Sequence, residues 1–267
     1  MEVGDSMISF GELRKKSVAW QMEISAVEKI YARDWLLKGM FDRDELRNAL
    51  SLRGASALAS AYFSDYPRVE DVDFARGVSL DDETLEREIE NAVSDAARAS
   101  SLQFRVNTFQ SSEARIEFTG PLGRRSAAQP LIVTRFVSTP PRIEPSPRAL
   151  LHPFNDACDA IVRAVSLDEL AAERIVLYSR NPRARDVFDL WFILTRGEKE
   201  LEIEKARALA QMIAIEKRVT LRAELDAKYA PLLERAWDKA LQEIRARPSF
   251  AEARAEIEAR LATLLSF

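Results

Sequence analysis

The sequence has very little cysteine and histidine, with one of each in 267 residues. A single cysteine, Cys158, excludes an internal disulfide and a cysteine-based zinc cluster. A single histidine, His152, argues against a histidine-rich metal site and against a Ser-His-Asp hydrolase. No apolar run approaches the ~20 residues of a membrane span, and residues 1–5 lack the basic and apolar regions of a signal peptide. These absences predict a cytoplasmic protein that has no membrane partner.

Charge is plentiful but nearly balanced. Hydrophobic residues make up 47% of the chain and charged residues 31%, and the formal net charge is −4. This composition is typical of a globular protein and gives no overall attraction to nucleic acid. Locally, however, six arginines lie between Arg115 and Arg148, against only Glu117 and Glu144. Such an excess suits contact with a phosphate backbone, and a solvated loop face is an equally good interpretation.

Apolar spacing and helix-breaking residues divide the chain into three expected regions. Residues 1–50 predict N-terminal helices that pack on the core. Residues 51–147 are expected to form a small mixed sheet with flanking helices. The four prolines within 139–147 mark the expected end of this domain. Residues 148–267 predict an almost entirely helical domain. The expected fold class is therefore α+β. Strands are expected near 70–74, 102–109, 114–118, 131–137 and 161–165, and helix starts at Ser79, Ser166, Pro231 and Pro248.

The segment from Leu52 to Leu58 predicts a short strand, a tight turn and the start of a helix. Gly54 permits the turn, which places Ser56 and nearby backbone N–H groups at a helix N-terminus. These groups attract phosphate oxygens because they are unpaired and lie at the positive end of the helix dipole. An ordinary strand-to-helix turn, which often needs a glycine, is the alternative interpretation.

Two aspartates follow on the next expected strand. Asp71 and Asp73 are two residues apart and would project from the same face of a strand. Two close carboxylates repel each other, and a shared divalent cation such as Mg²⁺ relieves that repulsion. A phosphate-binding turn facing a metal-binding aspartate pair is typical of nucleotidyltransferases. The alternative is a chance Asp-x-Asp spacing with no metal.

A second informative stretch runs from Glu173 to Leu190, where charged residues alternate with apolar ones. Asp186 and Asp189 are three residues apart, so they share one face of a helix, and Arg185 stands in the turn that leads into it. Taken alone, the stretch favours a charged helix-turn-helix held by surface ion pairs, each worth only ~0–1 kcal/mol.

With both stretches in view, the chain resembles the AbiEii-type nucleotidyltransferase family, the toxin half of some bacterial toxin–antitoxin and phage-defence systems. The Gly-Gly-Ser/Thr-Ala-Leu segment of that family is similar to Gly54–Leu58, and its Asp-x-Asp pair is similar to Asp71 and Asp73. Its later Glu-Lys-Leu and Arg-Asp-x-x-Asp-Leu segments are similar to Glu173–Ile175 and Arg185–Leu190. The resemblance covers roughly residues 10 to 195.

The resemblance implies a polymerase-β-like nucleotidyltransferase core and an enzyme that moves a nucleoside monophosphate from an NTP to an acceptor. The implied acceptor is RNA of the tRNA type, and a cognate antitoxin is an implied partner. The implied site residues are Asp71 and Asp73 as catalytic and Mg²⁺-binding groups, Asp189 as a further catalytic group, and Gly54, Ser56, Arg174 and Arg185 as nucleotide-binding groups.

The sequence departs from the family pattern at three points. Ala55 replaces the second glycine, and Arg174 replaces the lysine that the family places near the triphosphate. The third departure is that residues 131–135 offer no third carboxylate, so Glu117 or Asp186 would have to serve. These departures leave a second hypothesis open: a non-catalytic protein of the same fold that binds a nucleotide or an antitoxin.

Overall fold

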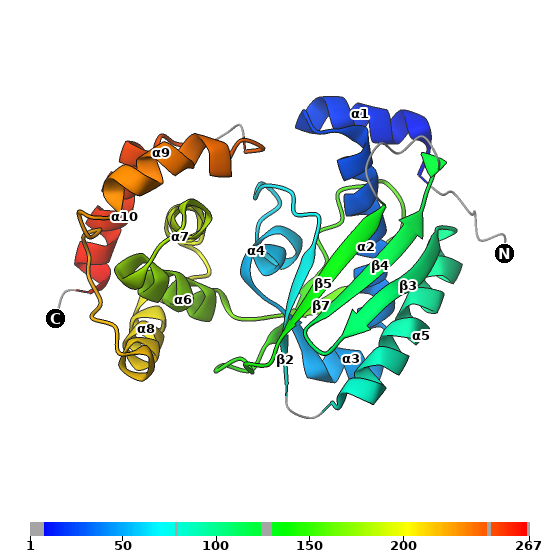
Figure 1. The fold of residues 1–267 in the computed structure, drawn as a ribbon, viewed down its shortest axis with the longest axis horizontal. Helices are drawn as coiled ribbons and strands as arrows, with labels where there is room; N and C mark the ends of the chain where they lie inside the picture. Colours follow the sequence, from blue (N-terminus) through cyan, green and yellow to red (C-terminus); the bar gives the residue numbers. More distant parts are fainter. Residues whose placement is uncertain (1–7, 78–79, 124–129, 245–246, 266–267) are drawn as a thin grey trace. The chain divides into compact units, whose positions relative to one another are not determined.

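The computed structural model describes residues 8–77, 80–123, 130–244 and 247–265 of the chain. The chain divides into two compact units, residues 1–165 and 166–267. Every strand found in the described residues belongs to the first unit, whereas the second consists of helices and their connections (Figure 1). The predicted α+β class, with a mixed sheet and a helical C-terminal part, is therefore confirmed.

The strands of the first unit form one mixed sheet. They are β1 (Leu50–Leu52), β2 (Val72–Arg76), β3 (Gln103–Gln110), β4 (Glu113–Thr119), β5 (Leu131–Val137), β6 (Ser146–Ala149) and β7 (Ile161–Ala164). Their order across the sheet is β3-β4-β5-β2-β1-β7-β6. The β2–β5 and β1–β7 pairs are parallel, and the other neighbouring pairs are antiparallel. Strand β2, which begins directly after Asp71 and contains Asp73, therefore lies in the middle of the sheet and is paired on both sides.

Helices cover one face of this sheet. The helical elements of the first unit are α1 (Phe10–Trp20), α2 (Ile24–Phe41), α3 (Asp44–Ala49), α4 (Gly54–Ala57), the π-helical turn η1 (Leu58–Tyr62) and α5 (Asp82–Ser100). Helices α2 and α5 pack against each other behind the sheet (Figure 1). They approach closely at Gly39, where a Cβ would collide with the backbone oxygen of Ala92. On β4 and β5, buried residues alternate with residues that are at least partly exposed, so the two strands bury one face and leave the other accessible.

The proline-rich segment, expected to separate two domains, lies inside the first unit. Strand β6 begins within that segment and pairs with β7, which in turn pairs with β1. Because β6 is an edge strand, Pro147 is tolerated there, since its missing N–H donor is not needed on the outer side. The boundary between the two compact units falls instead between Val165 and Ser166 in the chain.

Helix α5 begins two residues later than the sequence predicts. The cap is Asp81, whose side chain accepts a hydrogen bond from the N–H of Thr84 at 2.7 Å. Ser79, expected to cap this helix, lies outside the described residues. The N-cap carboxylate satisfies one of the first unpaired N–H groups of the helix and also favours the positive end of its dipole.

The second unit contains five helices in its described residues: α6 (Leu167–Arg180), α7 (Ala184–Arg196), α8 (Ile203–Lys217), α9 (Ala230–Ala240) and α10 (Phe250–Leu264). The expected start at Ser166 is confirmed, because its side chain accepts a hydrogen bond from the N–H of Glu169. Pro231 lies in the first turn of α9, as expected. Pro248 precedes the start of α10, where Ser249 and Glu252 form a capping box.

The single histidine is part of a buried polar network in the first unit rather than of a metal site. Its Nδ1 lies 3.0 Å from Asp34 Oδ2, and its Nε2 lies 2.5 Å from Asp156 Oδ1. Tyr31 donates a hydrogen bond to Asp156 at 2.6 Å, and Arg33 binds Asp34 and also the backbone oxygen of Val69. Burial alone would lower the pKa of His152, but the hydrogen bonds to Asp156 and Asp34 outweigh it and raise the pKa to about 9.

This network predicts a loss of stability in mild alkali. An unfolded histidine loses its proton near pH 6.5, whereas native His152 keeps it up to pH about 9. The resulting stabilisation is fully present below pH 6.5, and at most about 3 kcal/mol of it is lost as the pH rises through 9. Urea unfolding at pH 6.5 and 9 measures this loss. The His152→Gln variant should show a flatter pH dependence, and equal slopes for the two proteins would contradict the assignment.

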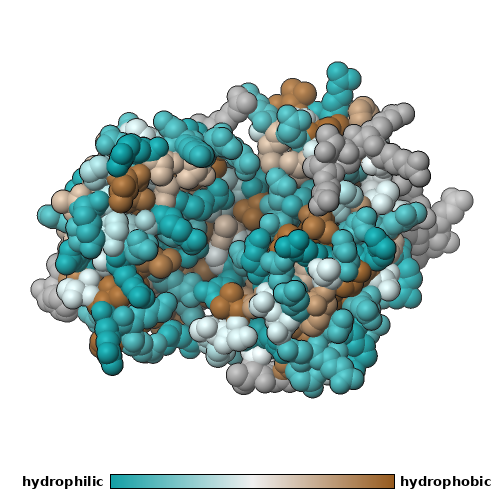
Figure 2. All heavy atoms as spheres, in the orientation of Figure 1, coloured by the Kyte–Doolittle hydropathy of each residue, from teal (hydrophilic) through white to brown (hydrophobic). Residues whose placement is uncertain are grey.

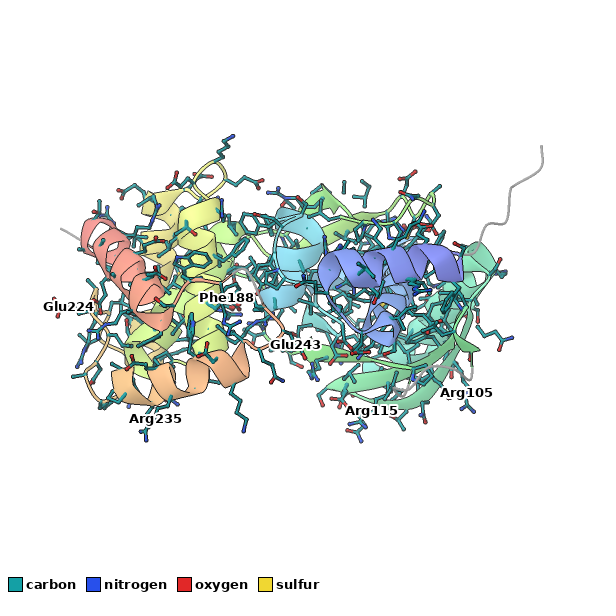
Figure 3. All side chains as sticks on the ribbon, turned by 90° about the horizontal axis from the view of Figure 1, so that it is seen from above. Arg105, Arg115, Phe188, Glu224, Arg235 and Glu243 are labelled. Carbon is teal, nitrogen blue, oxygen red and sulfur yellow. The ribbon has the colours of Figure 1, made fainter. Side chains whose placement is uncertain are left out.

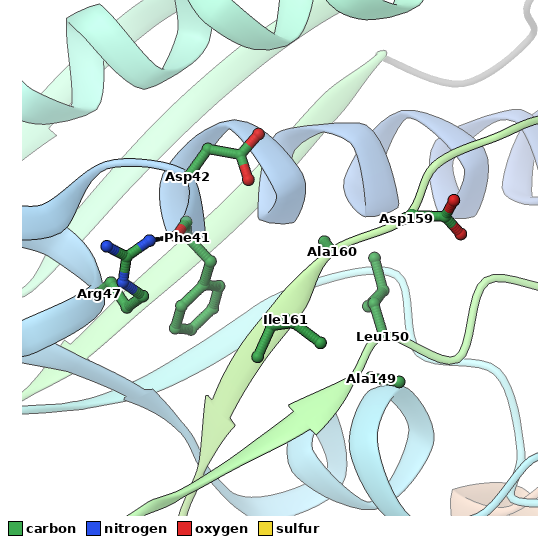
Figure 4. Close-up of a pocket in the computed structure, with 8 residues that line it drawn as sticks. All are labelled: Phe41, Asp42, Arg47, Ala149, Leu150, Asp159, Ala160 and Ile161. Atoms are coloured by element: carbon green, nitrogen blue, oxygen red, sulfur yellow. Dashed lines mark hydrogen bonds between the residues drawn. The ribbon is translucent and has the colours of Figure 1, made fainter.

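On the face that Figure 2 displays, hydrophilic side chains predominate and hydrophobic ones are scattered among them. None of the helices among the described residues is both long enough and apolar enough to span a membrane. A pocket of about 400 Å³ lies beside β6 and β7, and Phe41, Arg47, Leu150 and Ile161 are among its lining residues (Figure 4). None of its lining residues belongs to the site predicted from the sequence.

Candidate active site

The glycine turn has the geometry that the sequence predicts. Strand β1 ends at Leu52, and Gly54, with a φ of +55°, begins helix α4. This left-handed conformation suits glycine because it has no Cβ to clash. The N–H of Arg53 donates to the backbone oxygen of Asp73 at 3.0 Å, so the turn is joined to β2. Ala55 is not among the described residues with positive φ, so its Cβ introduces no backbone strain at the second glycine position.

Ser56 is engaged with the backbone on either side of Val72. Its hydroxyl donates to the backbone oxygen of Asp71 at 3.3 Å and accepts the N–H of Asp73 at 2.9 Å. The residue is buried. A hydroxyl has only one hydrogen to donate, so donation to a phosphate would break the contact with Asp71. The structure therefore gives Ser56 the geometry of a group that fixes the two aspartates.

This geometry predicts a measurable stability effect. Replacement of Ser56 by alanine should lower the free energy of unfolding by about 1–3 kcal/mol, because the N–H of Asp73 loses its acceptor in a part-buried site. Ser60→Ala is the matched control, since the Ser60 hydroxyl is equally buried but has no hydrogen-bond partner among the described residues. Urea unfolding of both variants compares the two effects. Equal effects would show that the Ser56 hydrogen bonds contribute nothing.

Asp71 and Asp73 lie on the accessible face of the sheet. Val72, which stands between them, is fully buried on the opposite face. Asp71 Oδ1 lies 2.9 Å from Lys29 Nζ and accepts the backbone N–H of Val133 at 3.3 Å. These contacts fix the orientation of the Asp71 carboxylate against helix α2 and strand β5.

Both aspartates also contact a single guanidinium. Arg135 Nη2 lies 3.5 Å from Asp71 Oδ2, and its Nη1 lies 3.6 Å from Asp73 Oδ1. The register explains the contact, because Arg135 on β5 is paired with Asp73 on β2. The two carboxylates therefore converge on the position of one cation.

This convergence fits Mg²⁺, although the described residues contain no group of three His, Cys, Asp or Glu side chains arranged to hold a metal. Mg²⁺ prefers oxygen ligands and is commonly bound by one or two carboxylates together with substrate phosphates and water. Asp71 and Asp73 supply two carboxylates that share one cation position. The donor set therefore matches a metal that arrives with a nucleotide.

A further carboxylate, Glu113, lies beside Arg135 and was not singled out from the sequence. Glu113 on β4 is paired with Arg135, and its Oε2 lies 3.8 Å from Arg135 Nε. Glu117 is paired with Leu131, four residues further along the strand, and binds Arg105. A strand rises about 3.4 Å per residue, so Glu117 lies more than 10 Å along β4 from this row. Of Glu113 and Glu117, Glu113 is therefore the one that the sheet places in the row of Asp73 and Arg135. Asp186 lies in the second unit.

The second cluster lies in the helical unit and joins α6 to α7. Nε and Nη2 of Arg174 both lie 3.1 Å from Asp189 Oδ2, and Arg185 Nε lies 3.6 Å from Asp189 Oδ1. Asp186, the other acid of this stretch, caps α7 by accepting the N–H of Arg183 and also binds its side chain. Asp189 is only 1% exposed, so these pairs are not the surface ion pairs of the alternative interpretation.

Arg174 stays protonated between these carboxylates. Burial lowers the pKa of its guanidinium, but the neighbouring charges of Asp189 and Asp186 outweigh that effect, and the pKa is raised. The arginine is therefore a permanent cation held in a fixed position by a buried carboxylate. Such a group can bind a phosphate, provided that its remaining N–H donors are accessible to the ligand.

The structure thus assembles the sequence-predicted residues in two sets. Gly54, Ser56, Asp71 and Asp73 meet in the first unit, and Arg174, Arg185 and Asp189 meet in the second. That the two sets form one site stays a prediction. Sequence reasoning missed Lys29, Glu113 and Arg135 as neighbours of the aspartates. Arg135 alone gave a signal, as the one charged residue within the mostly apolar strand β5.

Comparison with known proteins decides the family. A family model described as nucleotidyl transferase AbiEii toxin, type IV toxin–antitoxin system, matches residues 35–258. The chain belongs to the AbiEii nucleotidyltransferase family. The resemblance read from the motifs is thereby confirmed, and this AbiEii protein is a nucleotidyltransferase of the toxin type.

A solved structure supports the fold of this AbiEii protein. The nucleotidyltransferase toxin MenT4 from Mycobacterium tuberculosis H37Rv aligns with a TM-score of 0.69 and 18% sequence identity, over 97% of this chain and 90% of that chain. At this identity the likeness shows a shared nucleotidyltransferase toxin fold. No curated protein sequence matches the chain.

Proposed function

We propose that this AbiEii protein uses Mg²⁺ bound by Asp71 and Asp73 to transfer a nucleoside monophosphate from an NTP to RNA. The observation that carries the proposal is the convergence of the two carboxylates on one cation position. Bound there, Mg²⁺ would neutralise charge on the phosphates and on the attacking and leaving oxygens. The acceptor hydroxyl oxygen bonds to the α-phosphorus, its proton passes to water, and pyrophosphate leaves.

The chain's own residues have distinct parts in this proposal. The Gly54 turn brings the N-terminus of α4 beside β2, where its N–H groups would bind phosphate oxygens of the NTP. Ser56 holds the backbone of Asp71 and Asp73 at a fixed spacing. Arg174 and Arg185 bind the triphosphate, and Asp189 acts in catalysis by holding both arginines in place.

RNA of the tRNA type is the proposed acceptor, and its support comes from the family and from the open face of the sheet. Arg105 on β3 and Arg115 on β4 are exposed and point away from the strands (Figure 3). Each is paired with a glutamate, so a phosphate backbone would have to compete with Glu117 and Glu113. Arg124 and Arg125, which contribute to the arginine-rich stretch, lie outside the described residues.

The biological setting follows the family description. A type IV toxin–antitoxin system supports a cognate antitoxin as partner, and phage defence is the proposed role of the pair. NTPs and tRNA are cytoplasmic, so the proposed activity belongs to the cytoplasm.

Label transfer tests the proposal directly. The protein is incubated with each α-labelled NTP, Mg²⁺ and total RNA, and the RNA is separated from free nucleotide. Labelled RNA that depends on Mg²⁺ and is absent with Asp71→Asn supports the proposal. Label on protein in place of RNA would refute the proposed acceptor only. Nucleotide binding without transfer to RNA or protein would favour the non-catalytic binding protein.

A further inference from the structure

Each of the three guanidinium nitrogens of Arg135 contacts a carboxylate. Nη2 faces Asp71 at 3.5 Å, Nη1 faces Asp73 at 3.6 Å, and Nε faces Glu113 at 3.8 Å. The sheet enforces the arrangement, because Asp73, Arg135 and Glu113 lie in register on three neighbouring strands. Asp71 completes it from the position two residues before Asp73.

The two aspartates differ in how much they depend on this arginine. Asp71 also has Lys29 and the N–H of Val133 as partners. For the side chain of Asp73, Arg135 is the one ion-pair partner found among the described residues. Without Arg135, the repulsion between the two carboxylates would be left to Lys29, whose ion pairs among the described residues are with Asp71 and Glu70.

We propose that Arg135 is a positioning residue that couples metal binding to nucleotide binding, an inference that rests on the proposed function. In the metal-free protein its guanidinium holds Asp71 and Asp73 together. A divalent cation must take the same carboxylate oxygens, so guanidinium and metal compete for them. The released guanidinium is then available to the phosphates of the nucleotide that accompanies the metal.

The exposure of Arg135 makes this exchange physically reasonable. Its side chain is 46% exposed, so the guanidinium can turn outward without breaking the core. Its pairs with the aspartates are long and solvated, and such pairs are individually weak. Phosphate oxygens offer a guanidinium a comparable or better partner, because planar bidentate contacts suit it.

Thermodynamic linkage then determines whether metal and nucleotide strengthen or weaken each other's binding. If the nucleotide removes a cation that competes with the metal, the nucleotide must tighten metal binding, and the metal must tighten nucleotide binding by the same factor. Metal alone binds weakly, because nothing draws Arg135 away. Arg135 thus favours joint binding of metal and NTP over binding of metal alone.

The experiment measures metal affinity rather than activity. Mn²⁺ serves as the probe and is titrated by calorimetry into the full chain, first alone and then with each of the four α,β-methylene NTP analogues. The variants are Arg135→Ala, Arg135→Lys, Arg115→Ala and Asp73→Asn, each checked for its fold by circular dichroism. Arg115→Ala is the matched control, because Arg115 is 52% exposed on the same face and binds Glu113, with no contact to either aspartate.

We expect Arg135→Ala to bind Mn²⁺ alone about tenfold more tightly than the wild type, the effect of removing two exposed ion pairs, and to gain less from the nucleotide analogue. Arg135→Lys should lie between the two, and Arg115→Ala should stay within about twofold of the wild type. Unchanged Mn²⁺ affinity in Arg135→Ala would overturn the inference, as would an equal shift in Arg115→Ala.

The Asp73→Asn variant separates this inference from the proposed function. If it binds Mn²⁺ as well as the wild type, or if no protein in the set binds Mn²⁺, the proposed metal site is wrong and the inference falls with it. If Asp73→Asn alone loses binding while Arg135→Ala is unchanged, the metal site stands and only the role of Arg135 is wrong.

Discussion

Replacement of Asp73 by asparagine is expected to reduce nucleotidyl transfer by about a thousandfold or more while leaving the fold intact. A metal that stabilises transition-state charge contributes several kcal/mol, and each 1.36 kcal/mol is a factor of ten in rate. Asparagine keeps the size of the side chain but loses the charge that holds the metal. Initial rates of label transfer to RNA at saturating Mg²⁺ measure the loss.

Stability should hardly change in the same variant. Asp73 is about one-third exposed, and its ion pair with Arg135 is long, so the pair is worth at most about 1 kcal/mol. Its loss is offset by relief of the repulsion from Asp71. The backbone hydrogen bond from Asp73 to Ser56 is retained. An unchanged melting temperature with lost transfer supports a metal role, whereas a melt that falls by several degrees with transfer retained would assign Asp73 to the fold.

The features that could be predicted from the sequence are local. A glycine at position 54 predicts a positive φ, because few other residues adopt that conformation. The two-residue spacing of Asp71 and Asp73 places them on one face of the strand whatever the strand pairs with. Ser166 and Pro231 predict helix starts, because an N-cap side chain and a first-turn proline each act within one helical turn.

The features that escaped prediction depend on pairing between distant segments. Arg135 and Asp73 come together because β2 and β5 pair in parallel, with α5, β3 and β4 between them in the chain. A shift of one residue in that register would turn Arg135 to the buried face. The choice of Glu113 over Glu117 depends in turn on the register between β4 and β5, which pairs Glu113 with Arg135 and which neither segment specifies alone. The hydrogen bonds of Ser56 escaped prediction for a related reason, since they join its hydroxyl to the backbone of Asp71 and Asp73, which follow an irregular loop in the chain.

The expected domain boundary shows the same limit in another form. Four prolines in nine residues are typical of a linker, yet a four-residue edge strand can contain one of them. Strand β6 escaped prediction although its partner β7 was expected near 161–165, because the pairing of the two strands is not visible in either segment alone. Short edge strands therefore remain the weakest part of a reading based on periodicity.

Replacement of Arg174 by alanine is expected to lower the free energy of unfolding of the helical unit by about 3–5 kcal/mol. Arg174 binds Asp189, which is only 1% exposed, and lies near Asp186, which is 4% exposed. Without the guanidinium these acids keep Arg185 and Arg183, both on the outer side of α7 and more exposed. The penalty arises because a buried carboxylate loses a partner that water does not replace.

Three further variants make the Arg174 prediction specific, with urea unfolding as the measurement. Arg222→Ala breaks an exposed pair with Asp226 in the same unit and should cost less than about 1 kcal/mol. Arg174→Ala combined with Asp189→Asn should recover part of the loss, since the buried charge is gone. Arg174→Lys installs the lysine of the family pattern and should keep most of the stability and retain transfer to RNA. A cost for Arg174→Ala no larger than that of Arg222→Ala would show that the pair behaves as a surface ion pair, and the positioning role given to Asp189 would lose its basis.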